Sequence, residues 1–147
     1  MIKSLLDALT GAPQNEPETL DPPEAMAVLQ VRLARSDGSY KSQEKSIIIE
    51  ELIRLCDLSG SEAEQVLEEA EEIEAQGGDN VRFTKILKDS VDYEHRTGLV
   101  ESLWKIALAD GKRDFEEDGF MRLVANLLGV NDRDSALARQ AVQKMLP

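Results

Sequence analysis

Apolar side chains recur every three to four residues along most of this chain, which is the spacing of one face of a helix. No segment shows the strict alternation of apolar and polar residues that is typical of a half-buried strand. The pattern therefore predicts an all-α protein, a compact bundle of about seven helices. The segments with helical periodicity are residues 2–9, 22–35, 42–57, 62–76, 92–109 and 134–146, together with one that begins at Asn80 and one that ends at Gly129.

One motif occurs twice in the chain, and its aspartates, Asp37 and Asp110, are 73 positions apart. Each copy has an apolar helical stretch, the dipeptide Asp-Gly, and a glutamate seven positions after the aspartate. The copies are Leu33–Gly38 with Glu44, and Ile106–Gly111 with Glu117. Internal similarity of this kind indicates a duplicated structural unit. We expect two helical hairpins, over residues 24–57 and 97–130, related by an approximate two-fold axis.

The chain divides into two regions. Residues 1–21 hold a short amphipathic helix and a flexible linker rich in proline and glutamate. The apolar face of this helix consists of Ile2, Leu5, Leu6 and Leu9. We expect this face to dock on a partner protein, on a second copy of the chain in a homodimer, or on a membrane surface. Residues 22–147 form one all-helical domain, since their length suits a single core.

Several periodic segments give more local predictions. The helix over 42–57 carries two adjacent apolar rows, so we expect it to be mostly buried. The helix over 62–76 has seven glutamates and no basic residue beside a narrow apolar stripe, which predicts a solvated acidic face or a docking surface for a basic partner. Helix starts are indicated by capping-box spacings at Asp21/Glu24, Ser61/Glu64 and Asp114/Glu117, and by Asn80.

Charge and cysteine content narrow the possible functions. Asp and Glu outnumber Lys and Arg by 29 to 17, and the net charge of −12 argues against a nucleic-acid partner and favours a cation or a basic protein. No apolar run reaches the roughly 18 residues of a transmembrane helix. Cys56 is the only cysteine and falls in an apolar helical segment. We therefore expect a small buried side chain there, in a protein of a reducing compartment such as the cytoplasm.

The repeated Asp-Gly…Glu motif has two interpretations. Asp37 and Asp110 can accept backbone N–H groups where a helix ends, while Glu44 and Glu117 stand near the third position of the next helix, where a glutamate caps the helix start. Alternatively, the four carboxylates converge and bind a divalent cation. Their hard oxygen ligands suit Ca²⁺, Mg²⁺ or Mn²⁺. The spacing differs from that of an EF-hand loop.

Other catalytic chemistry is sparse. His95, the only histidine, lies in a polar helix start, where we expect an exposed or hydrogen-bonded side chain rather than a ligand or base. Trp104 shares its helical spacing with Leu103 and Ala107, which favours a place in the core. Two functional hypotheses remain: a non-enzymatic interaction or cation-sensing module, and a divalent-metal-dependent enzyme that uses the acidic cluster. The lack of a nucleophile and base constellation favours the first.

These motifs resemble those of a known family. The paired Ala-x-x-Asp-Gly…Glu units are similar to the TerB-like family of bacterial tellurite-resistance-associated proteins, which includes the N-terminal domain of the DjlA-type co-chaperones. The resemblance covers residues 24–145 and includes Arg82–Thr84, Leu103–Gly111 and Leu127–Val130. It implies a helical fold with internal pseudo-symmetry and a role in tellurite or general stress resistance. It also implies a bacterial protein that is cytoplasmic or peripheral at the inner membrane.

The resemblance further implies metal binding at the acidic motif residues, which are Asp37, Glu44, Asp110 and Glu117. The chain departs from the family pattern at Ser36 and Lys41 in the first unit and at Gly119 in the second. These departures weaken a complete ligand set.

Overall fold

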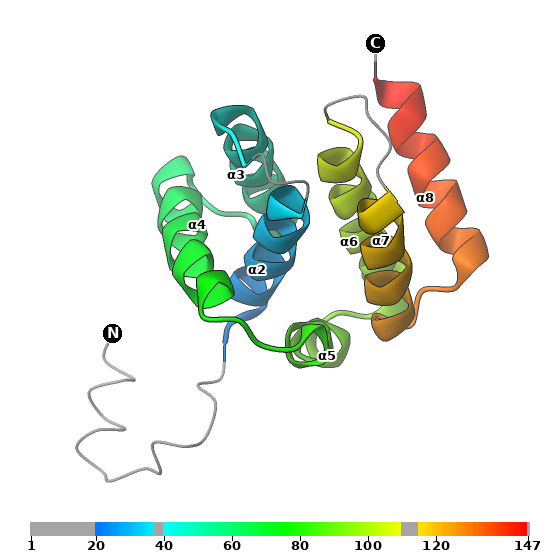
Figure 1. The fold of residues 1–147 in the computed structure, drawn as a ribbon, viewed down its shortest axis with the longest axis horizontal. Coiled ribbons are helices and arrows are strands. Elements are labelled where there is room, and N and C mark those ends of the chain that lie inside the picture. The colour runs from blue at the N-terminus through cyan, green and yellow to red at the C-terminus, as the bar shows by residue number, and fades with distance from the viewer. Residues whose placement is uncertain (1–19, 37–39, 110–114, 147) are drawn as a thin grey trace, which may run out of the picture.

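The computed structural model describes residues 20–36, 40–109 and 115–146, and of residues 115–117 the backbone alone. This part of the chain forms seven α-helices and contains no strand, which confirms the all-α prediction. None of these helices has both the length and the apolar character needed to cross a bilayer. The expected helix over residues 2–9 lies outside the described residues. The helices are α2 (Pro22–Arg35), α3 (Ser42–Cys56), α4 (Gly60–Ala75), α5 (Asn80–Ser90), α6 (Tyr93–Ala107), α7 (Phe115–Leu127) and α8 (Asp132–Met145) (Figure 1).

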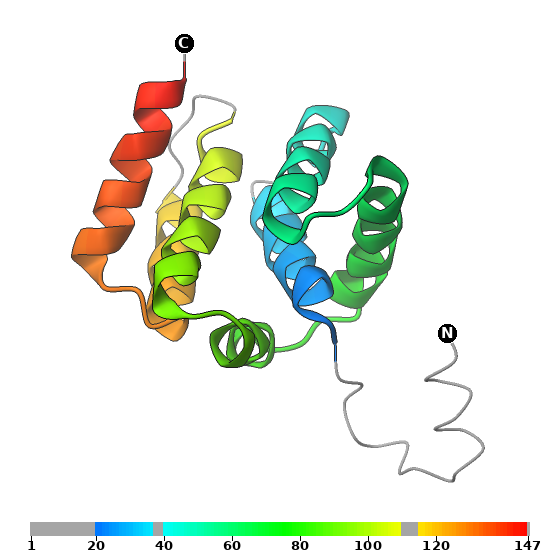
Figure 2. The ribbon, with the colours of Figure 1, turned by 180° about the vertical axis from the view of Figure 1, so that it is seen from behind.

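Two groups of three helices stand side by side. Figure 1 shows α2, α3 and α4 on one side and α6, α7 and α8 on the other, and Figure 2 shows the same division from behind. Helix α5 crosses below both groups, is seen end-on in either view, and packs against α2, α6 and α7. The two groups touch through α2 and α6 and through α3 and α6. We call α2–α4 the first unit and α6–α8 the second unit.

The two units repeat the same chain path. The hairpins predicted over 24–57 and 97–130 are formed by α2–α3 and α6–α7. Each hairpin is followed by a third helix, α4 or α8, which packs against both of its members. The sequence repeat therefore marks a unit of three helices, one more than the motif predicts. Superposition of the hairpins by a two-fold axis stays a prediction.

The loops before the third helices also match. Asp57 and Gly129 both adopt a left-handed backbone conformation, with φ of 54° and 77°. Two residues later, Ser59 and Asn131 cap the helices that follow. In each loop an apolar side chain, Leu58 or Val130, lies between these two positions and packs on the core. This shared pattern aligns α4 with α8 residue by residue.

Helix α2 is buried along most of its length. It packs against α3, α4, α5 and α6, and its side chains from Ala25 to Val31 are all buried. Its alanines let neighbouring helices approach closely, and its buried amide, Gln30, donates to Ser102 Oγ at 3.1 Å. The prediction that the helix over 42–57 is mostly buried is wrong, because most side chains of α3 keep part of their surface exposed to solvent. The buried residues of α3 are Ile48, Glu51 and Leu52.

Helix α4 begins two residues before the start that Ser61 and Glu64 predict. Ser59 Oγ accepts the N–H of Glu62 at 3.1 Å, and Glu62 Oε1 accepts the N–H of Ser59 at 2.9 Å. Both pairs have the capping-box spacing, so spacing alone does not distinguish them. Leu58 packs on the core and leaves Ser59 as the first residue in a position to cap.

Three other predicted caps have different outcomes. Helix α5 is capped by Asp79, which accepts the N–H of Val81, and not by Asn80. Asp21 holds the N-cap position of α2 as predicted, but its side chain makes no cap hydrogen bond. The cap predicted at Asp114 lies outside the described residues.

A buried carboxylate links the two units. Glu51 on α3 pairs with Lys105 on α6 at 3.2 Å and with Arg54 at 2.7 Å. Burial raises the pKa of Glu51, but hydrogen bonding and the charges of Arg54 and Lys105 outweigh burial, so this pKa lies below its usual range. Glu51 therefore stays ionised and ties α3 to α6.

Candidate functional site

The four acidic residues of the repeated motif are described only in part. Glu44 lies in the first turn of α3, and its Oε2 accepts the backbone N–H of Lys41 at 3.2 Å. This is the capping role that the motif predicts for this position. Asp37 and Asp110 lie outside the described residues, as does the side chain of Glu117.

Whether the motif also binds a cation stays a prediction. The ends of α2 and α6 that precede the two Asp-Gly dipeptides lie at the same end of the molecule (Figure 1, Figure 2). Within the residues that the structure describes, no group of three or more His, Cys, Asp or Glu side chains is placed to hold a metal ion. The described geometry therefore supports capping at Glu44 and leaves shared ligation untested.

The glutamate face of α4 is not uniformly solvated, contrary to prediction. Glu74 binds two arginines at the end of α2, with Arg35 Nη1 at 2.8 Å and Arg32 Nε at 3.2 Å. Glu71 pairs with Lys45 on α3 at 3.2 Å. Burial raises the pKa of Glu74, but hydrogen bonds from both arginines outweigh it and hold the pKa below its usual range. These pairs fasten α4 to α2 and α3.

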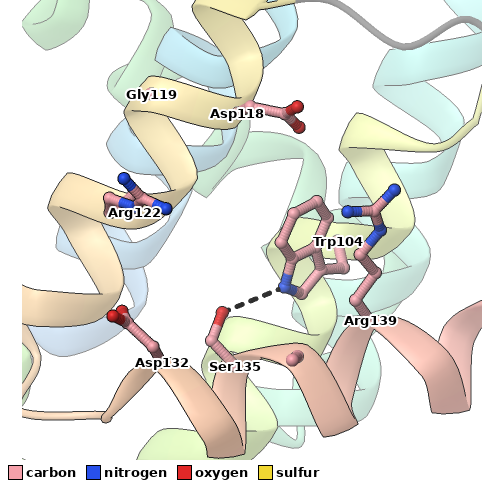
Figure 3. A pocket seen from close by; sticks show the side chains of 8 residues that line it. Trp104, Asp118, Gly119, Arg122, Asp132, Ser135 and Arg139 are labelled. Atoms are coloured by element: carbon pink, nitrogen blue, oxygen red, sulfur yellow. Dashed lines mark hydrogen bonds between the residues drawn. The ribbon is translucent and has the colours of Figure 1, made fainter.

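A pocket of about 440 Å³ with both charged and apolar residues in its lining lies between α6, α7 and α8. Trp104 forms its floor and is 7% exposed, which confirms the prediction of a core position. The indole Nε1 donates to Ser135 Oγ at 3.3 Å (Figure 3). Four charged side chains surround the pocket: Asp118 and Arg122 from α7, and Asp132 and Arg139 from α8.

The helical periodicity of the sequence does not reveal this pocket. On a single helix, Arg122 and Arg139 have the appearance of ordinary solvated positions. A comparison of the two repeats position by position carries the missing signal, because the motif offset pairs Arg122 with Ile49 and Trp104 with Val31. A charged residue in one copy of a repeat, opposite an apolar residue in the other, indicates a difference in packing.

A second depression, a groove, runs along the outer side of α6 and α8 and also encloses about 440 Å³. Its apolar part includes Leu137, which is 51% exposed, with Ala138 and Ala141 beside it. The charged residues that line it are Glu94, Glu101 and Asp134. All three are acidic, so the groove combines an apolar strip with a negative border.

The remaining candidate residues have no catalytic arrangement around them. His95 is exposed and hydrogen-bonded to the carboxylate of Asp92, as predicted. Cys56 is half-buried rather than fully buried, and burial raises the pKa of its thiol. A thiol with a raised pKa is a weak nucleophile at neutral pH.

Comparison with solved structures finds the same fold. A crystal structure of a protein of unknown function, PG1108 from Porphyromonas gingivalis W83, is similar with a TM-score of 0.58 and 16% sequence identity. The similarity covers 89% of this chain and 96% of that protein. The chain matches no curated protein.

The sequence also matches a described protein family. Residues 23–140 match the family described as "Tellurite resistance protein TerB". The match includes both copies of the Asp-Gly…Glu motif and every helix of the two units, except the start of α2 and the last turns of α8. The chain therefore belongs to the TerB family of tellurite-resistance-associated proteins.

Proposed function

We propose that the chain acts in tellurite or general stress resistance as a non-catalytic module that binds a basic, amphipathic helix of a partner protein. The groove between α6 and α8 is the observation that carries this proposal. Family membership supports the association with tellurite resistance. The partner follows from the shape and charge of the groove.

The groove suits a helix rather than an extended strand or a small molecule. Two neighbouring helices, α6 and α8, form its sides, and the lining residues of each recur at helical spacing. An amphipathic helix places apolar side chains at the same spacing, so it can lay them along Leu137 and Ala141. Leu137 gains most from this contact, because about half of its surface is exposed in the free chain.

The charge of the groove favours a basic partner. Glu94, Glu101 and Asp134 lie along its border, and no basic residue lines it. Lysines beside the apolar face of a partner helix would lie near these carboxylates. The net charge of −12 adds a long-range attraction for any basic segment. Binding of this type weakens as salt is added.

Fluorescence anisotropy with a labelled model peptide tests the proposal. The peptide carries leucines at helical spacing on one face and lysines elsewhere, and a matched peptide carries glutamates instead of the lysines. We expect saturable binding of the lysine peptide alone. Binding of both peptides with equal affinity, or of neither, would contradict the proposal.

Charge-neutral variants locate the site. Two surface charge contacts of about 0.5 kcal/mol each predict that Glu94→Gln with Glu101→Gln weakens peptide binding about fivefold. The control, Glu64→Gln with Glu68→Gln, makes the same change in charge on exposed positions of α4. We expect no more than the small effect of net charge from the control. Equal weakening by both pairs would show that attraction is non-specific and would overturn the groove as the site.

The alternative function, a divalent-metal-dependent enzyme, receives no support from the described geometry. Glu44 is engaged with the backbone of Lys41, and no catalytic arrangement surrounds it. Thermal unfolding with added Ca²⁺, Mg²⁺ or Mn²⁺ separates a cation-sensing role from simple capping. A shared cation raises the melting temperature by mass action, and Asp110→Asn removes that gain.

A further inference from the structure

The outer face of α8 carries an apolar stripe that extends beyond the peptide groove. Its members are Leu137, Ala141 and Met145, which recur every four residues and therefore lie on one side of the helix. Leu137 is 51% exposed and Met145 is 59% exposed in the single chain. In both views α8 forms the outer edge of the second unit, so this side of the helix faces solvent (Figure 1, Figure 2).

The equivalent face of the first unit is polar at two of these three positions. The alignment of the two helix caps described above places Gln65 and Glu69 of α4 where α8 has Leu137 and Ala141. Only the third position is apolar in both helices. Helix α4 forms the opposite outer edge of the molecule, so the two helices hold the same place in their units (Figure 1). Apolar residues on the outer face of only one copy indicate a contact surface.

We propose that this stripe is the contact surface of a homodimer, in which α8 of a second copy lies antiparallel along α8 and covers the peptide groove. The inference rests on the proposed function in one respect, because the groove that receives the second α8 is the groove assigned to a partner helix. Dimerisation then regulates partner binding, since one groove accommodates one helix at a time. Both copies offer the same surface, as in an isologous pair with two-fold symmetry.

The charges along α8 are complementary to those of a second α8 in the antiparallel direction. Asp132 and Asp134 lie in its first turn, and Lys144 lies in its last turn. An antiparallel pair that sets Leu137 against Ala141 of the second copy also sets Asp134 against Lys144. One register therefore matches a large apolar side chain with a small one and brings opposite charges together. A parallel pair would bring like charges together at both ends.

The groove adds a second carboxylate to the charge contact. Tyr93 on α6 donates to Oδ2 of Asp134 at 2.5 Å, so the starts of α6 and α8 lie side by side. Glu94 follows Tyr93 and lines the groove at this end. In the antiparallel pair, Lys144 of the second copy reaches this end and lies near the carboxylates of Asp134 and Glu94. Helix α8 thus has the properties of the groove's proposed occupant, an apolar stripe with a basic residue beside it.

The size of the contact predicts a weak dimer. Helix α8 has 14 residues and is about 21 Å long. A pair of helices of this length buries less than the roughly 1,200 Å² at the lower end of stable interfaces. Two copies with a net charge of −12 each also repel one another. We therefore expect a reversible dimer, with the groove free in dilute solution and covered at high chain concentration.

Analytical ultracentrifugation of the full chain over a range of concentrations tests the proposal. We expect an equilibrium between monomer and dimer that strengthens as salt is added, because salt screens the repulsion between the two copies. Binding of the lysine peptide weakens under the same change, so the salt dependence distinguishes the two events. A chain that stays monomeric at every concentration would overturn the proposal.

A substitution copied from the first unit locates the contact. Leu137→Gln installs the residue that α4 has at the equivalent exposed position, so we expect the variant to keep its helical circular dichroism. Both copies lose an apolar contact, which predicts about thirtyfold weaker dimerisation. The control, Leu123→Gln, makes the same change at an exposed leucine of α7 and should leave dimerisation unchanged. Equal weakening by the two variants would show non-specific self-association and would overturn the proposal.

An exchange of charges tests the antiparallel register. Lys144→Glu and Asp134→Lys each bring like charges together at both contacts of the symmetric dimer, so we expect about tenfold weaker self-association of either variant. A mixture of the two variants restores opposite charges at both contacts. We expect the mixture to form a heterodimer about as strong as the wild-type dimer. A mixture that associates no better than either variant alone would overturn the proposed pairing.

The lysine peptide separates this inference from the proposed function. Added peptide should dissociate the dimer, because both occupy the same groove. An unchanged dimer with bound peptide would overturn the inference that α8 of the second copy covers the groove. Peptide binding by a chain that never dimerises overturns this inference alone, whereas a dimer without peptide binding overturns the proposed function alone.

Discussion

The two units of this molecule share a chain path but differ in how their third helix is held. In the first unit, Leu67 and Ala63 bury the inner face of α4 in the core, and Glu74 fastens α4 to Arg32 and Arg35. In the second unit, the seam between α7 and α8 opens into a pocket with charged walls. One scaffold can therefore be closed by packing in one copy and left open to solvent in the other.

The largest expected change in stability comes from exchanging residues between equivalent positions of α4 and α8. Leu67→Arg places an unpaired charge in a filled apolar seam, and we expect a loss of about 4 kcal/mol or more in the free energy of unfolding. The reverse change, Arg139→Leu, should alter it by no more than about 1 kcal/mol, because the open seam accommodates an apolar side chain. Urea denaturation measures both. Similar losses in the two variants would show that the seams are equivalent.

The start of the first unit predicts a pH effect on stability. Glu24 follows the N-cap of α2 by three residues, as His95 follows the N-cap of α6, but Glu24 is buried and His95 is exposed. Burial, with the charges of Glu69 and Asp21, raises the pKa of Glu24 to about 7. Because this pKa is raised on folding, stability is fully present below pH 4.5 and falls as the pH rises through 7.

Glu24→Gln removes this pH dependence. From pH 4.5 to pH 8, we expect the stability of the variant relative to the wild type to rise by at most about 3 kcal/mol. Urea denaturation across this pH range provides the measurement. A constant difference between variant and wild type would contradict a buried, protonated Glu24.

The ion pairs of Glu74, which hold α4 against α2 in the first unit, give another test of the comparison. Glu74→Gln should lower the free energy of unfolding by about 2 kcal/mol, since it weakens two charge-assisted contacts with Arg32 and Arg35. The pKa of Glu74 is lowered on folding, so this contribution is present above the ordinary glutamate pKa and disappears as the pH falls through the lower folded value. Glu72→Gln, an exposed neighbour on α4, serves as the control and should have little effect. Equal losses in the free energy of unfolding of the two variants would show that the ion pairs of Glu74 do not stabilise the first unit.

The smallest predicted effect concerns the matched left-handed positions, Asp57 and Gly129. Asp57→Gly should stabilise the chain by about 0.5–1 kcal/mol, because glycine adopts a positive φ without strain. Gly129→Ala should destabilise it by about 1–2 kcal/mol. The added Cβ would lie 3.0 Å from Arg96 Nη1, which donates to the carbonyl of Leu128. Thermal unfolding of the two variants measures both changes in stability. Changes of the same sign would contradict the equivalence of the two loops.

Much of the fold could be predicted from the sequence, because helical periodicity and helix-ending glycines act locally. Gly129 ends α7 as expected, and both hairpins appear where the repeated motif indicates. Burial was harder to predict. The apolar rows of the helix over 42–57 suggested a mostly buried helix, yet α2 is buried along most of its length and α3 is not. That property depends on the arrangement of all the helices, which no single segment encodes.

Within the candidate site, only contacts between residues close together in the sequence could be predicted. The capping role of Glu44 depends on residues three positions apart, and the structure confirms it. The pocket around Trp104 depends on α7 and α8 facing each other across α6, so the periodicity of either helix alone does not reveal it. The inward contacts of Glu71 and Glu74 were missed for the same reason.

Amide hydrogen exchange, measured by mass spectrometry on the full chain, tests the central claim that one unit is closed by packing and the other is open. A filled apolar seam opens rarely, whereas a polar seam with fewer buried contacts opens at lower free energy. We predict that amides of α8 exchange through openings of lower free energy than amides of α4, and that Arg139→Leu reduces the difference. Equal protection of α4 and α8, or stronger protection of α8, would contradict the account.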